Sequence, residues 1–209
     1  MKRTAQHSPE KLVATTLPAL LIVGLSLKSG GYPPGIPATA ACLILLLLAA
    51  LVLLAPGAVR PLGGPQAIVA LALVGLTAWT LASTLWSHAP ARAVTAASRD
   101  LFYLVTFCGL ATLRAPALRS VVRGCAAGAV IVTVIALGPR LAPDVFSLSP
   151  DATTQRLAWP LSYQNALGLL LSLGLLLTLH LTSDRGERLG VQMAAAAAVP
   201  PIVSALWLT

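Results

Sequence analysis

The chain has 209 residues, of which 57% are hydrophobic and only 10% are charged. Because a soluble domain carries about 25% charged residues, this composition excludes an ordinary soluble protein and indicates an integral membrane protein. The net charge of +8 comes from basic residues that stand singly between apolar runs, a topological pattern that argues against nucleic acid as a partner.

Runs rich in leucine and alanine, without the alternation of barrel strands, predict an all-α, polytopic transmembrane helical bundle. A helix needs about 20 residues to cross a hydrocarbon core of about 30 Å. A cytoplasmic tail at residues 1–11 precedes an uncleaved first span, and the bundle fills residues 12–209. The seven predicted spans lie near residues 12–27, 38–55, 66–86, 94–113, 118–137, 162–182 and 189–208.

The fourth span is the least apolar of the seven. Its continuous apolar run, Leu101–Leu113, is short for a crossing. Starting the helix near Val94 supplies the length and places Arg99 and Asp100 near the membrane surface. The polar segment Ser87–Asp100 leads into this apolar run and is predicted to lie at the outer face, as is the loop Gly138–Pro160.

The distribution of basic residues tests this topology. A cytoplasmic N-terminus puts nine basic residues inside and five outside, whereas an interfacial fourth run would give six inside and eight outside. The positive-inside rule therefore favours seven spans. The nine inside are Lys2, Arg3, Lys11, Arg60, Arg114, Arg119, Arg123, Arg185 and Arg188, and the five outside are Lys28, Arg92, Arg99, Arg140 and Arg156.

The start of the sixth span combines a basic residue with a helix terminus. Arg156 precedes a break at Trp159-Pro160, and the helix is predicted to begin at Ser162. The free N–H groups and positive dipole end of a helix, beside an arginine, form an anion site. At a membrane surface the natural anion is a lipid phosphate or diphosphate. Arg156 is interpreted either as a diphosphate contact or as a snorkelling interface residue.

Other polar residues have two interpretations each. Asn165 either contacts a sugar or phosphate oxygen or satisfies the backbone at the helix start, and capping with Ser162 as the N-cap is favoured. Tyr163, like Trp159 and Trp86, is favoured as an interface aromatic over a sugar-stacking platform.

Charged residues elsewhere are interpreted more simply. Arg99 either contacts a ligand or forms a locally neutralised pair with Asp100. The basic residues Arg114, Arg119 and Arg123 are predicted to anchor the cytoplasmic side to anionic headgroups of the membrane lipids.

Two sequence elements carry a resemblance: WSHAP at residues 86–90, with Arg99 and Tyr103, and RLAWPLSYQNALG at residues 156–168. Together they resemble the amino-terminal half of the O-antigen ligase and O-antigen polymerase family of bacterial envelope proteins. The resemblance extends from about residue 71 to the end. It implies a multi-pass protein of the bacterial plasma (inner) membrane in cell envelope polysaccharide biosynthesis.

The resemblance also implies an activity and a site. A glycosyltransferase-like protein of this kind takes a glycan from an undecaprenyl-diphosphate carrier at the outer face and transfers it to a lipid, glycan or protein. Residues implied to contact the substrate and its diphosphate are Arg156, Arg99, Asn165 and Tyr163.

The family's late outer loop, which carries a histidine base, has no counterpart in the sequence. We therefore assign no catalytic residue, cofactor or metal, and expect the chain to be a truncated front half or inactive alone. The alternative is a small multi-span transporter or a non-catalytic membrane scaffold. The sequence has no carboxylate in the middle of a predicted span and no inverted repeat, and both absences weaken the transporter alternative. Oligomeric state stays open, because the glycine face at Gly124 to Gly128 suits packing within or between chains.

Overall fold

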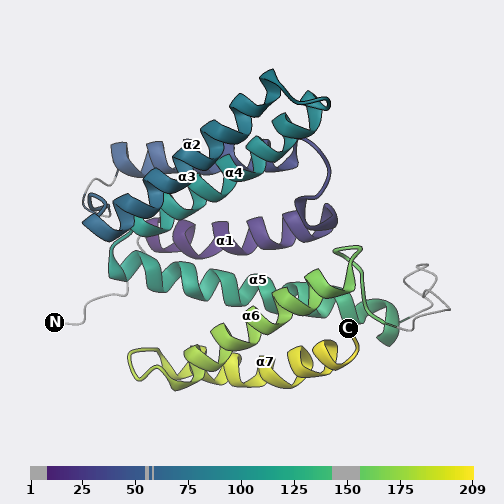
Figure 1. Cartoon of the computed structure of the whole chain (residues 1–209). Helices are drawn as coiled ribbons and strands as arrows, with labels where there is room; N and C mark the ends of the chain where they lie inside the picture. The colour runs from purple at the N-terminus through teal and green to yellow at the C-terminus, as the bar shows by residue number, and fades with distance from the viewer. Residues whose placement is uncertain (1–8, 55–56, 58, 143–155) are drawn as a thin grey trace. The chain divides into compact units, whose positions relative to one another are not determined.

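The computed structural model describes residues 9–54, 57, 59–142 and 156–209, and the regular secondary structure of these residues is helical apart from one isolated bridge between Val59 and Leu113. The all-α prediction is confirmed. Most of the predicted N-terminal tail and residues 143–155 of the loop before the sixth span lie outside the described residues. In chain order the elements are α1 (Pro9–Leu27), η1 (Ser29–Gly31), α2 (Ile36–Leu54), α3 (Gly64–Ala82), η3 (Ser83–Leu85), α4 (Pro90–Thr112), α5 (Ala115–Leu141), α6 (Gln164–Ser183) and α7 (Leu189–Trp207) (Figure 1).

Proline sets the start of several helices. Pro65 and Pro90 lie in the first turns of α3 and α4, where the missing N–H removes no helical hydrogen bond and the fixed φ suits the helix. At α3, the Gly63 N–H also donates to Gln66 Oε1 at 3.0 Å, which satisfies a backbone donor at the helix end. These local signals begin α3 and α4.

Four helices of the described chain are long and apolar enough to cross a membrane. They are Gly64–Leu85, Ala115–Leu141, Gln164–Ser183 and Leu189–Trp207, with 22, 27, 20 and 19 residues. Shorter apolar stretches lie at Ala14–Leu27 and Ile36–Ala50. The protein is thus a multi-pass helical membrane protein by helix length and composition, while crossings by α1, α2 and α4 stay predictions.

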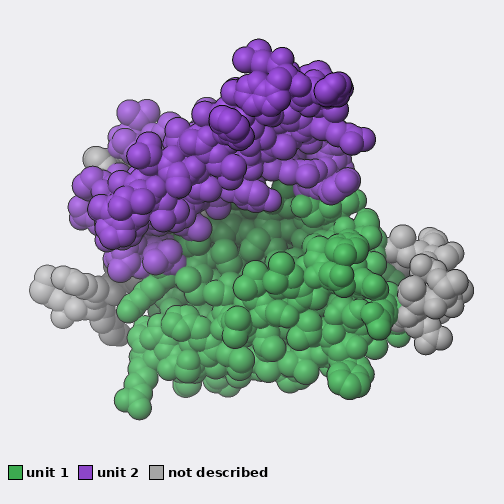
Figure 2. Space-filling view, viewed as in Figure 1, with its two compact units in different colours: residues 1–30, 119–209 green, residues 31–118 purple. Residues whose placement is uncertain are grey.

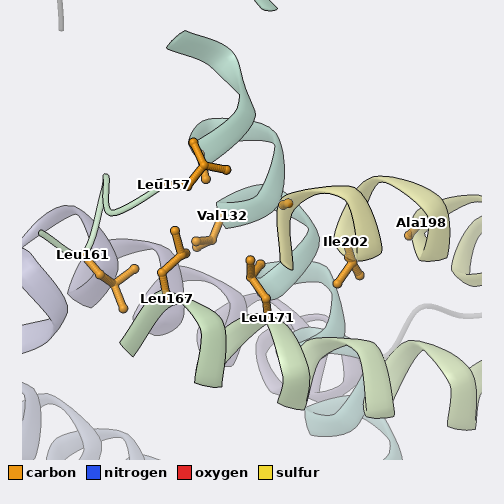
Figure 3. Close-up of a cluster of buried hydrophobic side chains, with 9 residues drawn as sticks. Val132, Leu157, Leu161, Leu167, Leu171, Ala198 and Ile202 are labelled. Atoms are coloured by element: carbon orange, nitrogen blue, oxygen red, sulfur yellow. The ribbon is translucent and has the colours of Figure 1, made fainter. Parts of the chain in front are cut away.

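The chain folds into two compact units, residues 1–30 with 119–209 and residues 31–118, hereafter unit 1 and unit 2 (Figure 2). Unit 1 contains α1, α6, α7 and nearly all of α5. Its core joins α5, α6 and α7 with the segment that precedes α6 (Figure 3). The buried residues of this core are Val132, Ala136, Leu157, Leu161, Leu167, Leu171, Ala198, Ile202 and Ala205.

Small residues bring the helices of unit 1 into close contact. A Cβ added at Gly124 would overlap the Thr15 carbonyl oxygen, and one at Gly128 would lie 3.1 Å from the Ala19 Cα. The glycine face of α5 therefore packs within the chain, against α1, as small-residue interfaces in membranes do. The contact four residues further along α5, at Gly128, also lies four residues further along α1, at Ala19. The two helices therefore run parallel.

Unit 2 is built from α2, α3 and α4, and α4 packs against both of the others. Gly109 of α4 makes room for Leu48 of α2, whose Cδ1 would lie 3.2 Å from an added Cβ. Beyond the helix ends, the Arg60 N–H donates to the Thr112 carbonyl at 2.8 Å. These contacts fix α4 as the central helix of the unit.

Two predicted helix starts are wrong by a few residues. The fourth helix begins at Pro90 and not near Val94, since the alanine-rich stretch before the apolar run is a good helix former. The sixth begins at Gln164, because Ser162 has a left-handed φ of 64° that no helix interior accepts.

Candidate functional site

The segment from Arg156 to Tyr163 closes one end of the core of unit 1 and leads into α6. Its Leu157 N–H donates to the Leu208 carbonyl at the end of α7, at 2.8 Å. Leu157 and Leu161 are buried in the core (Figure 3), whereas Arg156 is exposed. The chain is therefore anchored by its leucines while the guanidinium at its start stays accessible.

The first turn of α6 has no side-chain cap. Tyr163 is the N-cap residue, with extended backbone angles of φ −142° and ψ 116°, and no side chain hydrogen-bonds to this described helix end. The helical bonds begin with Leu167 N–H to the Tyr163 carbonyl at 3.1 Å. The earlier N–H groups of the turn have no intrahelical acceptor, as at any helix start. An anion would find donors and a positive dipole end here.

The predicted capping by Ser162 and Asn165 is wrong. Ser162 lies one residue before the N-cap, and its hydroxyl pairs with that of Ser29 at 3.2 Å. Asn165 Nδ2 donates instead to the Tyr163 phenol oxygen at 2.8 Å. The physical reason is the left-handed Ser162 backbone, which points its side chain away from the turn that a β-region N-cap would serve. Both Tyr163 and Asn165 are exposed.

Arg99 and Asp100 do not neutralise each other. Arg99 Nη2 donates to the Tyr32 carbonyl at 3.0 Å, and its guanidinium lies 5.0 Å from the centre of the Tyr32 ring. Asp100 Oδ2 accepts a hydrogen bond from Thr80 at 2.8 Å. Neighbouring positions on a helix point about 100° apart, so each side chain reaches a different segment of unit 2. Arg99 thus holds the loop before α2, and its partly exposed guanidinium group keeps further hydrogen-bond donors.

The exposed aromatic residues fit an interface role. Trp79 and Trp86 contact each other edge to face at 5.7 Å between ring centroids, near the end of α3. Both are largely exposed, at 69% and 58%. Amphipathic rings at the end of a candidate span are typical of the membrane–water boundary.

Sequence reasoning missed the Arg123–Glu187 pair. Arg123 Nε donates to both carboxylate oxygens of Glu187 at 3.0 Å, and Nη2 lies 2.7 Å from Oε2. The Glu187 side chain is 1% exposed. Arg123 therefore pairs with the loop between α6 and α7, and its role as a lipid anchor stays a prediction. The available signal was charge complementarity between two loops predicted on the same side.

Two of the four predicted substrate residues, Tyr163 and Asn165, pair with each other at the start of α6, and Arg156 begins the described segment that leads into this helix. Arg99 belongs to unit 2. No protein-family model, curated protein or solved structure matches the chain. The candidate site is thus defined by its own geometry: an uncapped helix start, an exposed arginine before it and an amide–phenol pair beside it.

Proposed function

We propose that this protein is a seven-span membrane protein that binds the diphosphate of a polyprenyl-linked glycan at the start of α6. The observation that carries the proposal is the first turn of α6, which has free N–H donors and no side-chain cap while the exposed Arg156 precedes it. A helix start of this kind favours a multiply charged anion.

Helix directions support seven crossings. Within unit 1, α1 and α5 are parallel, as the contacts of Gly124 with Thr15 and of Gly128 with Ala19 require. If both helices cross the membrane in the same direction, the chain between them crosses an odd number of times. That segment holds α2, α3 and α4, so a crossing by all three agrees with this count. The charge distribution independently favours the same topology.

The neighbouring side chains suit a sugar diphosphate. Arg156 supplies a permanently charged fork for phosphate oxygens. Asn165 and Tyr163, paired at 2.8 Å, hold each other in one orientation and keep further donor and acceptor capacity. These residues bind and position the carrier, and we name no catalytic base.

The reaction class follows from the resemblance to the O-antigen ligase and polymerase family. An acceptor hydroxyl attacks the anomeric carbon of the glycan, and undecaprenyl diphosphate leaves. Arginines at the outer face stabilise the charge that develops on the departing diphosphate. In this scheme the chain contributes part of the carrier-binding site.

The test measures binding and does not require transfer activity. Protein reconstituted in neutral-lipid nanodiscs is titrated with undecaprenyl diphosphate, with undecaprenol as the uncharged comparison. A charge-assisted hydrogen bond contributes about 1.5–3 kcal/mol, so Arg156→Ala should weaken diphosphate binding about tenfold or more. The affinity of Arg156→Lys should lie between those of the unmodified protein and Arg156→Ala, because lysine keeps the positive charge but lacks the planar guanidinium group.

Arg60→Ala is the matched control, since Arg60 is an exposed arginine that belongs to unit 2. Its binding constant should equal that of the unmodified protein. Equal binding of undecaprenol, or unchanged binding in Arg156→Ala, would reject a diphosphate site at this helix start and leave the scaffold interpretation.

A further inference from the structure

The five residues between α6 and α7 form a closely bonded loop. The Gly186 N–H donates to Asp184 Oδ1 at 2.8 Å, and Gln192 Nε2 donates to the Asp184 carbonyl at 2.7 Å. Glu187 is held by Arg123 through its buried carboxylate. The loop is therefore pinned both to its own turn and to the start of α5.

Around this loop the exposed arginines outnumber the carboxylates that have no arginine partner. The Glu187 charge is matched by Arg123 at 2.7 Å. Arg185 and Arg188 are exposed. Arg119, one helical turn before Arg123, is exposed as well, and its Nη1 would lie 3.4 Å from a Cβ added at Gly186. Three exposed arginines thus lie in the loop or beside it, against one further carboxylate, that of Asp184, which accepts the hydrogen bond from Gly186.

The surface lies at the ends of candidate spans. The loop connects Gln164–Ser183 with Leu189–Trp207, and Arg119 belongs to the first turns of Ala115–Leu141. That last helix, with 27 residues, is about 40 Å long at 1.5 Å per residue. It exceeds a hydrocarbon core of about 30 Å by about two turns, which is enough length for its first turns to lie in the headgroup region.

We propose that Arg119, Arg185 and Arg188 form a docking surface for the phosphates of anionic phospholipids. The partner is assigned by charge complementarity: a phosphodiester headgroup is the anion that a membrane presents at this level. Arg123 and Glu187 build the surface and do not contact the lipid. The surface lies at the far end of α6 from the proposed diphosphate site, about 30 Å along a helix of 20 residues, and is independent of that function.

The test compares lipid preference between charge-matched variants. The whole protein is reconstituted in vesicles of phosphatidylcholine and phosphatidylglycerol at a ratio of about 3:1, and retained lipids are counted by native mass spectrometry. One arginine near an anionic surface contributes about fivefold in affinity. The triple variant Arg119→Gln/Arg185→Gln/Arg188→Gln should therefore lower the preference for phosphatidylglycerol at least about tenfold.

Two further variants make the result decisive. Lys28→Gln/Arg60→Gln/Arg92→Gln removes three exposed charges from other parts of the chain and should keep the preference. Replacement of the three docking arginines by lysine should also keep it, because the surface acts through charge. The proposal is overturned if the glutamine triple keeps the preference, if the control triple loses it equally, or if the lysine triple loses it.

Discussion

Breaking the Arg123–Glu187 pair should be among the most destabilising single changes at the end of unit 1. Arg123→Ala leaves a carboxylate that is 1% exposed without the three contacts of 2.7–3.0 Å that now satisfy it. Removing one partner of a buried ion pair costs about 3–5 kcal/mol. Because the Arg123 side chain is 34% exposed, solvent screens part of the interaction, and we expect a loss of about 2–3 kcal/mol.

The assay is unfolding in mixed micelles, in which a denaturing detergent is titrated and helix content is followed by circular dichroism. Arg188→Ala is the control, since an exposed arginine in the same loop should change stability by less than about 0.5 kcal/mol. A double replacement by methionine at positions 123 and 187 should cost less than Arg123→Ala, because no charge is left buried. The reasoning is refuted if Arg123→Ala is no more destabilising than the control.

Three other predictions concern packing and topology. Gly124→Ala should destabilise the protein by about 1–3 kcal/mol, because the new methyl group meets the backbone of α1. Gly75→Ala is the control, since nothing lies within 4 Å of its added Cβ, and it should leave stability unchanged or raise it by up to about 1 kcal/mol. Thermal unfolding compares the two variants, and equal effects would contradict the close contact between α1 and α5. Ile202→Ala should cost about 2–5 kcal/mol in the same assay, because the side chain is 0% exposed in the core. Tyr163→Cys and Ser183→Cys, made separately in a cysteine-free background, place a thiol at the N-cap and at the last residue of α6. A membrane-impermeant maleimide should label the two variants from opposite sides of the membrane, and labelling from one side would reject a crossing by α6.

The helices were predictable because one strong signal specifies them. Long apolar runs require internally satisfied backbone in lipid, and prolines or glycine-rich turns separate them. Where hydropathy decreases, as before the fourth and sixth apolar runs, the predicted helix starts were wrong. Residues 90–100 are polar enough to look like a loop, yet Pro90 starts a helix there and the alanines continue it. Hydropathy finds the part of a helix that suits lipid and not the whole helix.

The side-chain partners at the candidate sites were not predictable, because they join distant segments. Ser162 pairs with Ser29 across 133 positions, and Arg123 pairs with Glu187 across 64. A local pattern such as a serine before a helix favours capping, but a tertiary contact and a left-handed φ outweighed it. Sequence therefore identified the helix start with its arginine, whereas the detailed bonding required the structure.

The missing cap at α6 offers a direct way to separate a structural from a binding role of this helix start. Tyr163→Asp places a carboxylate at the N-cap, which should stabilise the protein by about 0.5–2 kcal/mol and occupy the donors proposed for the diphosphate. Tyr163→Phe removes only the phenol that pairs with Asn165 and serves as the control. If the uncapped turn binds diphosphate, the aspartate variant is more stable than the phenylalanine variant but binds undecaprenyl diphosphate at least about tenfold more weakly. A gain in stability with unchanged binding would place the diphosphate elsewhere and leave the turn as an ordinary frayed helix end.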